Sequence, residues 1–210
     1  MKFNRPCCRL KVTQMNETLP QVYLVRHGET AWSITGQHTG RTDIPLTERG
    51  KQAAQGLRAG LKELSFAQVF TSPLQRARQT AELAGFGESA EADPDLMEWD
   101  YGDYEGRRTV DIRAEHPGWG LFENGCPGGE TLVQVATRAD RVVTKIRAFG
   151  SNVLVFAHRD ILRMLITRWL ALPAIEARRF NLATASVSTL GYDHGLNEPI
   201  LHRLNDAGHA

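Results

Sequence analysis

The sequence predicts a three-layer α/β/α protein with a mostly parallel central sheet and a small irregular cap insertion. Short apolar runs alternate with amphipathic segments along most of the chain, which is typical of helices packed on both faces of a parallel sheet. The 210 residues are enough for one domain with a substantial core. Hydrophobic residues make up 41% and charged residues 23% of the chain, so its composition is that of an ordinary globular protein.

Five short runs predict the strands. Three of them are continuously apolar, as expected of buried strands, and lie at 21–26, 67–72 and 152–158. The last two alternate between apolar and polar residues and predict a terminal hairpin over 186–194 and 199–206.

Four amphipathic stretches predict the helices. One begins after Thr47, whose hydroxyl suits the N-cap position, and another begins with Pro73 at the first helical position. The third covers 130–149, and the fourth follows His158. Each is long enough to cover a strand, so the helices are expected to form the outer layers.

Two stretches lack a clear period. Residues 27–45 are rich in glycine, hydroxyls and amides, and we expect a long loop there. Residues 87–130 are rich in glycine, acids and aromatic residues and predict a cap-like insertion within a single domain, 21–210. Residues 1–20 are expected to be a disordered extension, with a chain start at Met15 as the alternative.

Charge and cysteine content narrow the partners and the location. The formal net charge is +1 and no basic run is present, so neither nucleic acid nor a membrane surface is an expected partner. No run reaches the roughly 18 apolar residues of a transmembrane helix, and the N-terminus lacks the apolar centre of a signal peptide. The three cysteines (Cys7, Cys8 and Cys126) are a poor disulfide framework, which favours reduced thiols and a cytoplasmic location.

Polar residues follow three of the predicted strands. Arg26 and His27 end the first, Thr71 and Ser72 end the second, and His158 ends the third. Because ligands of parallel α/β sheets bind outside the carboxyl ends of the strands, we expect these side chains to share one active site.

Five motifs support this interpretation and occur in a fixed order: RHGET (26–30), TSPLQRARQTA (71–81), LMEWDYGDYEG (96–106), GCPGGET (125–131) and FAH (156–158). Together they closely resemble the histidine phosphatase superfamily, the phosphoglycerate-mutase-like family, over about residues 21–204. The resemblance implies a metal-independent phosphomonoesterase that needs no cofactor and hydrolyses small phosphorylated metabolites through a phosphohistidine.

The resemblance also assigns five catalytic residues. His27 matches the phosphorylated histidine, and His158 matches the second histidine. Arg26 and Arg76 match phosphate ligands, a role that suits the bidentate, permanently charged guanidinium. Glu98 matches the general acid, which requires a raised pKa so that the carboxyl keeps its proton near neutral pH. A lone histidine after a strand is more often a hydrogen-bonded core residue, and a lone loop carboxylate is more often solvated.

Substrate contacts are expected at Ser33, Gln37, Thr39, Gly40 and Arg159. Two of these positions depart from the family pattern, because many relatives have asparagine in place of Ser33 and glycine in place of Arg159. We expect Arg159 either to pair with Asp160 or another acid, or to contact the substrate.

The branch of the family is suggested by GQHTGRTDIPLT, EWDYGDYEG and NGCPGGET, which resemble sedoheptulose-1,7-bisphosphatase-type members and favour a sugar phosphate substrate. A phosphoglycerate mutase is the first alternative, although the chain lacks the longer insertion of cofactor-dependent mutases. An inactive relative that binds phosphorylated ligands is the second. A metalloenzyme is disfavoured because the seven histidines show no metal-ligand spacing. The apolar run 169–172 suits either a homodimer contact or a buried helix end.

Overall fold

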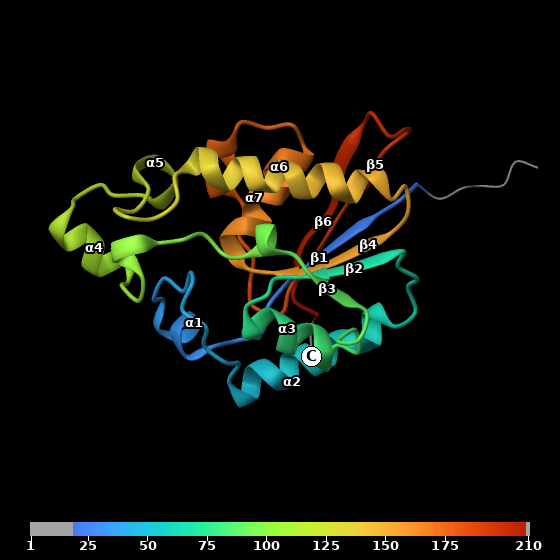
Figure 1. Cartoon of the computed structure of the whole chain (residues 1–210), viewed down its shortest axis with the longest axis horizontal. Coiled ribbons are helices and arrows are strands. Elements are labelled where there is room, and N and C mark those ends of the chain that lie inside the picture. Colours follow the sequence, from blue (N-terminus) through green and yellow to red (C-terminus); the bar gives the residue numbers. More distant parts are fainter. Residues whose placement is uncertain (1–18, 209–210) are drawn as a thin grey trace, which may run out of the picture.

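The strands form one six-stranded sheet in the order β3-β2-β4-β1-β5-β6 (Figure 1). The computed structural model describes residues 19–208. The strands are β1 (Val22–Arg26), β2 (Gln68–Thr71), β3 (Ala90–Ala92), β4 (Val153–Ala157), β5 (Val187–Tyr192) and β6 (Pro199–Asp206). β1, β2, β3 and β4 run parallel, whereas β5 is antiparallel to both of its neighbours. The predicted mostly parallel sheet and terminal hairpin are confirmed.

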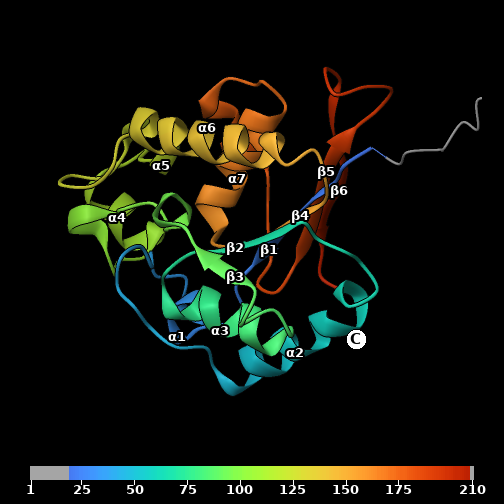
Figure 2. The ribbon, with the colours of Figure 1, turned by 45° about the vertical axis from the view of Figure 1, so that its right-hand side comes forward.

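Helices cover both faces of this sheet, as Figures 1 and 2 show. One face carries α2 (Glu48–Leu61) and α3 (Gln75–Leu83), and the other carries α6 (Leu132–Ala148) and α7 (Arg159–Trp169). The central strand β4 is buried on both sides. Its residue Val155 belongs to the core cluster with α6 and α7, whereas the next residue, Phe156, belongs to the cluster with α2 and α3. This alternation is the pleat of a strand between two helical layers.

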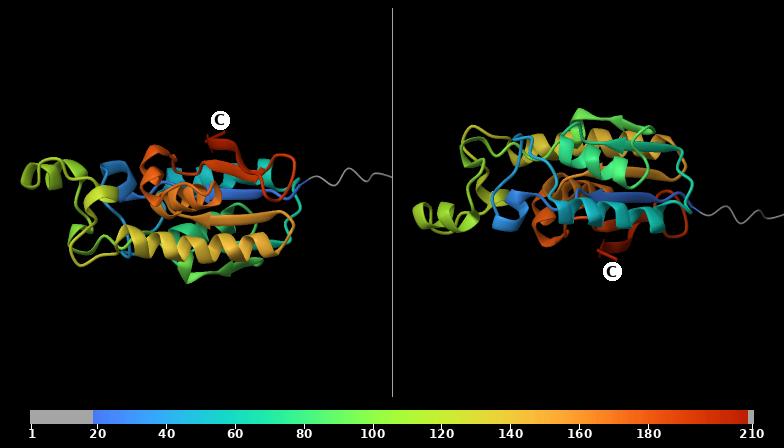
Figure 3. Two further views of the ribbon diagram at one scale, coloured as in Figure 1. Left: turned by 90° about the horizontal axis from the view of Figure 1, so that it is seen from above. Right: turned by 90° about the horizontal axis from the view of Figure 1, so that it is seen from below.

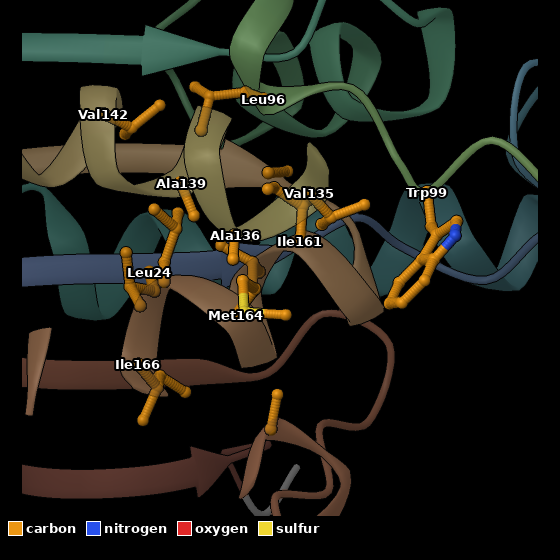
Figure 4. Packing of buried hydrophobic residues seen from close by; sticks show 14 of the residues in the cluster. Leu24, Leu96, Trp99, Val135, Ala136, Ala139, Val142, Ile161, Met164 and Ile166 are labelled. Atoms are coloured by element: carbon orange, nitrogen blue, oxygen red, sulfur yellow. The ribbon is translucent and has the colours of Figure 1, made fainter. Parts of the chain in front are cut away.

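The larger core lies between the sheet and the helices α6 and α7 (Figure 4). Val135 and Ala139 of α6, Ile161 and Met164 of α7 and Leu24 of β1 are almost completely buried in this cluster. Burial of each large aliphatic side chain contributes about 1.5–3 kcal/mol to stability. This packing fixes α7, whose first turn borders the active site described below.

Two of the helix starts show how local capping sets element boundaries. Thr47 is the N-cap of α2, as predicted, and its hydroxyl accepts a hydrogen bond from the Gly50 amide. The prediction that Pro73 opens the next helix is wrong, because α3 begins at Gln75 after an extended Leu74. The Gln75 amide donates to Asp43 Oδ1 at 2.7 Å, so a loop carboxylate far away in the sequence sets this start.

The predicted loop 27–45 contains one short helix, α1 (Ala31–Thr35). Thr30 and Ser33 form a capping box, in which each side chain accepts a hydrogen bond from the other residue's backbone amide. Gly36 ends the helix with a φ of 76°, a left-handed conformation that glycine adopts without strain. The five-residue helix therefore arises from its caps rather than from an apolar period.

The segment 87–130 is partly a cap and partly sheet. It begins with β3, which pairs in parallel with β2 and forms one edge of the sheet, so the expected insertion starts after this strand. The remainder holds η1 (Pro94–Leu96), η2 (Gly102–Tyr104), α4 (Thr109–Glu115) and α5 (Leu121–Asn124). Figure 3 shows α4 projecting at one end of the molecule. The interior of this cap segment is aromatic, because Tyr104 and Trp119 pack edge to face with ring centroids 5.4 Å apart.

The predicted extension lies mostly outside the described residues, as do Met15, Cys7 and Cys8. Leu19 packs against the larger core, so the folded region starts slightly before residue 21. Cys126 is a free thiol, and burial raises its pKa to about 12. Within residues 19–208, no helix has the length and apolar character required to cross a bilayer.

Candidate active site

The carboxyl ends of three parallel strands bring the predicted polar residues together. The His27 amide donates to Ala157 O at 2.9 Å, and the Ser72 amide donates to Phe156 O at 2.9 Å. These bonds continue the sheet ladder one residue past the strand ends and fix the backbone there. The rings of His27 and His158 lie with their centroids 5.2 Å apart. The expected clustering of side chains at this edge is confirmed.

His27 is held as a neutral imidazole. Its Nδ1 lies 2.7 Å from Gly28 O, a carbonyl that only accepts, so Nδ1 carries the proton. The ring is 4% exposed, and burial together with the charges of Arg76 and Arg26 lowers its pKa well below the usual value. Nε2 therefore keeps its lone pair, and within residues 19–208 no side chain or backbone group is bonded to it. This nitrogen is a competent nucleophile.

His158 is neutral for the same reasons, which answers a question that the sequence leaves open. Burial, Arg76 and His27 lower its pKa well below the usual value. Its Nδ1 accepts a hydrogen bond from Arg76 Nε at 3.0 Å, so the proton resides on Nε2, which donates to Ser72 Oγ at 2.7 Å. Ser72 orients this ring, a role that the sequence did not suggest although Ser72 stands at a strand end.

Arg76 is a fully buried cation held by neutral acceptors. Besides the bond to His158, its terminal nitrogens donate to the carbonyls of Thr39, Gly40 and Thr42 at 2.9–3.0 Å. Burial lowers its pKa, but an arginine keeps its charge at any physiological pH. Because none of these acceptors is a carboxylate, the positive charge stays available to an anion beside the two histidines.

Arg26 adds a second cation with an unsatisfied donor. Its Nη1 donates to Leu182 O at 2.5 Å, whereas its buried Nε has no hydrogen-bond partner among the described residues. Burial and the charge of Arg159 lower its pKa to about 10. An unpaired buried donor costs about 1–3 kcal/mol, and an oxygen of a bound phosphate would satisfy it.

Glu98 lies against the amino end of α7. Its Oε1 accepts from the amides of Trp99, Asp160 and Ile161 at 3.0–3.2 Å, and its Oε2 accepts only from the Asp160 amide at 3.1 Å. His158, the N-cap residue of this helix, makes no side-chain cap, so Glu98 supplies it. Burial and the neighbouring Asp160 raise the pKa of Glu98, although the backbone hydrogen bonds oppose the shift.

Asp160 is the ionised partner of this carboxyl pair. Its Oδ2 accepts from the Tyr101 hydroxyl at 2.6 Å and its Oδ1 from Arg163 Nη1 at 2.7 Å. Burial would raise the pKa of Asp160, but Arg159 and Arg163 outweigh it and hold the pKa below the usual value. Two neighbouring carboxyls with opposed pKa shifts are typical of acid–base sites. Sequence reasoning named Asp160 only as a partner for Arg159 and missed this arrangement.

The loop residues predicted to contact substrate lie at the same edge with different partners. The Ser33 hydroxyl donates to Thr30 O, and Gln37 Nε2 donates to Gly106 O at 2.8 Å, so both side chains brace the loop. The carbonyl oxygens of Thr39 and Gly40 accept hydrogen bonds from Arg76 Nη2. A β-carbon on Gly40 would lie 2.5 Å from Trp99 O, so only glycine fits there.

A potential metal-binding cluster lies elsewhere. In the described part of the chain, one group of three metal-ligating side chains lies close enough together to share an ion. It consists of Asp193, His194 and Glu198, all of which are exposed. They follow the end of β5, which runs antiparallel to β1, so they lie at the sheet edge opposite the two histidines.

This fold and this edge define a class of protein, an α/β enzyme that handles phosphate with paired histidines and arginines. Comparison of the sequence with known protein families narrows this class to one family. Residues 22–207 match the model of the histidine phosphatase superfamily, branch 1, and the chain belongs to that family.

Individual relatives agree. An acid phosphatase of Mycobacterium tuberculosis is 42% identical over 182 residues, which cover 85% of this chain and 89% of the relative. The sedoheptulose 1,7-bisphosphatase of Saccharomyces cerevisiae is 36% identical over 193 residues, 75% of this chain and 70% of the relative. A solved M. tuberculosis structure superposes with a TM-score of 0.85 at 40% identity and covers 90% of this chain and 99% of its own. The protein is therefore a histidine phosphatase.

Proposed function

We propose that this phosphatase hydrolyses monoesters of small phosphorylated metabolites, sugar phosphates above all, with His27 as its nucleophile. The observation that carries the proposal is the buried, neutral His27, whose Nδ1 is committed to Gly28 O and whose Nε2 is free. The relatives with phosphatase names support hydrolysis, and the yeast bisphosphatase supports a sugar phosphate.

The reaction has two steps. In the first, His27 Nε2 attacks phosphorus, the bond from phosphorus to the ester oxygen breaks, and Glu98 gives that oxygen its proton. In the second, water attacks the phosphohistidine, Glu98 takes a proton from the water, and the P–N bond breaks to return His27 and phosphate. Arg26 and Arg76 neutralise the equatorial oxygens, and His158 lies beside the transferred group.

Glu98 Oε2 is the oxygen best placed to carry the acidic proton. It accepts one backbone hydrogen bond, whereas Oε1 accepts three. A protonated Glu98 therefore keeps most of its contacts to α7 while Oε2 donates. The other residues assigned to substrate binding belong to one loop, and their contacts with substrate stay a prediction: Ser33, Gln37, Thr39 and Gly40.

Phosphate release in the presence of EDTA tests the proposal. We expect the purified enzyme to release phosphate from several sugar phosphates and from an activated aryl phosphate at rates that EDTA does not change. Conversion of 3-phosphoglycerate to 2-phosphoglycerate without phosphate release would instead favour the mutase alternative. Binding of these compounds without any turnover would favour the inactive relative, and loss of activity in EDTA would contradict the mechanism.

A second expected result concerns pH. Asp160 carries a negative charge that raises the pKa of Glu98, so Asp160→Asn should lower that pKa. The acid form of Glu98 would then be lost at lower pH, and the alkaline limb of the pH profile of kcat for an alkyl phosphate should move to lower pH. Three positive charges also act on the Glu98 carboxyl, and the variant leaves these residues in place: Arg26, Arg76 and Arg159.

The matched control for this variant is Asp193→Asn, which removes the same charge from the exposed hairpin tip. An unmoved alkaline limb in Asp160→Asn, with activity retained, would show that Asp160 does not tune the acid.

Location and assembly complete the proposal. We propose a cytoplasmic enzyme, which fits the free thiol of Cys126. The homodimer stays a prediction, which analytical ultracentrifugation of the purified protein would test. Within the apolar run 169–172, Trp169 is buried and its Nε1 donates to Gly191 O at 3.1 Å, so this side chain is not available for such a contact.

A further inference from the structure

Arg159 is a half-exposed cation at the edge of the active site whose side chain forms one long ion pair, with Asp160 as expected, and makes no hydrogen bond within the described part of the chain. It is the first residue of α7 and directly follows His158, and its side chain is 48% exposed. The nearest carboxylate is Asp160, whose Oδ1 lies 3.9 Å from Arg159 Nε, beyond hydrogen-bond distance. Among the described residues, the Arg159 guanidinium donates no hydrogen bond.

The carboxylate of Asp160 is already satisfied by other groups. Arg163 Nη1 donates to Oδ1 at 2.7 Å, and the Tyr101 hydroxyl donates to Oδ2 at 2.6 Å. Arg163 is buried and is further fixed by the carbonyls of Ala177 and Arg178. Asp160 therefore takes its side-chain hydrogen bonds from Arg163 and Tyr101, and Arg159, whose charge also lowers the pKa of Asp160, keeps its hydrogen-bond donors unused among the described residues.

The charges of the site can be compared with those of its substrate. A phosphate monoester brings about two negative charges near pH 7. Arg26 and Arg76 match these two charges, and both lie against the histidines. Glu98 is neutral when it acts as the acid, and Asp160 is paired with Arg163. Glu105 contacts the loop through the amides of Gly40 and Thr42. Glu105 also brings one negative charge close to Arg76. Among these arginines, Arg159 is the one whose guanidinium donates no hydrogen bond to another described residue.

The position of Arg159 indicates which part of a substrate it would meet. Its charge lowers the pKa of Arg26 and also the pKa of His38 in the loop. The His38 ring packs on Tyr101 with centroids 4.7 Å apart. Arg159 therefore lies directly after His158 and within electrostatic reach of both Arg26 and the loop, at the edge from which the part of the substrate that is not transferred can extend.

We propose that Arg159 selects substrates that carry a second anionic group, a phosphate or a carboxylate, on the part of the molecule that stays with the leaving oxygen. This inference rests on the proposed function, because it assumes that the transferred phosphoryl group lies at His27. A planar guanidinium suits either anion through paired hydrogen bonds.

Pairs of substrates that differ in one anionic group test the proposal. Fructose 1,6-bisphosphate is compared with fructose 1-phosphate and fructose 6-phosphate, and 3-phosphoglycerate with glycerol 3-phosphate. The first set tests a second phosphate and the second tests a carboxylate. The wild-type enzyme should have the higher kcat/KM on the doubly anionic member of at least one set. In Arg159→Gln this ratio should fall by about tenfold or more, mainly through KM, because a charge-assisted hydrogen bond is lost.

Two variants serve as references. Arg159→Lys keeps the charge without the planar fork and should retain part of the preference. Arg203→Gln removes an arginine from β6, which is separated from β1 by β5, and should leave the ratio unchanged. A ratio that Arg159→Gln leaves within twofold of the wild-type value, or a wild-type preference for the singly anionic compounds, would overturn the proposal.

Binding to an inactive enzyme separates this inference from the proposed function. In a His27→Ala background, calorimetry should show tighter binding of the preferred doubly anionic compound than of its partner, and Arg159→Gln should remove the difference. This result is expected even if the wild-type enzyme releases no phosphate, an outcome that would contradict hydrolysis and leave the second anion site supported. Equal binding of both compounds would contradict the second anion site alone.

Discussion

His27→Ala should reduce phosphate release by three orders of magnitude or more, about the loss seen when a covalent nucleophile is removed from an enzyme. The variant lacks the imidazole nitrogen that we propose attacks phosphorus in the first step, so the substrate would have to be hydrolysed by direct attack of water. The two arginines would still bind the substrate, and KM should change far less than kcat. The measurement is steady-state release from an activated aryl phosphate, for which protonation of the leaving group is least demanding.

The matched control is His202→Ala, which removes an exposed histidine from β6 and should keep nearly all activity. Near-ultraviolet circular dichroism should show that His27→Ala is folded like the wild type. Denaturing the wild-type enzyme in alkali during turnover should also trap a phosphorylated protein that His27→Ala lacks. A variant that retains a tenth of the activity, or that is still phosphorylated, would show that another residue is the nucleophile.

Glu98→Gln should separate substrates by their leaving groups. An alkoxide leaving from a sugar phosphate needs a proton, and loss of a general acid costs about 10²–10⁴-fold in rate. A nitrophenolate leaves readily without one, so hydrolysis of p-nitrophenyl phosphate should fall by much less. The experiment compares kcat/KM of wild type and variant on both substrates.

Glutamine is a suitable replacement because it keeps one oxygen. Oε1 accepts three of the four backbone hydrogen bonds, so an amide in the same place still caps α7. The control is Glu91→Gln, which alters an exposed glutamate on β3 at the sheet edge. Equal loss on both substrates would exclude the acid role and leave Glu98 as a helix cap.

The predictable part of the fold is the part with strong local signals. The continuous apolar run of β4 and the capping threonine of α2 were sufficient to place those elements. β3 was missed because its sequence, Ala-Glu-Ala, has no apolar period and forms a strand only by pairing with β2. The start of α3 was misplaced because it depends on Asp43, which is 32 residues from Gln75.

The candidate site likewise has a part that the sequence predicts and a part that only the structure shows. His27 and His158 could be found from their places at strand ends and from their motifs. Ser72 could also be placed in the site from its position at a strand end, but its role could not. The roles of Ser72, Tyr101 and Asp160 depend on contacts between distant segments, such as the hydrogen bond from Tyr101 to Asp160, 59 residues apart. Burial and Asp160 raise the pKa of Glu98, whereas Arg159 and Arg163 hold the pKa of Asp160 low, and both effects exist only in the folded chain.

The hydrogen bond from His27 Nδ1 to Gly28 O has a chemical consequence for the phosphorylated enzyme. With Nδ1 committed, the phosphoryl group can join only the distal nitrogen, so turnover produces a single positional isomer, the tele-phosphohistidine. The phosphorylated ring then carries a positive charge that strengthens its bond to the carbonyl and makes the ring a better leaving group for water to displace. Reagents that distinguish the tele from the pros isomer would therefore report on this tautomer directly.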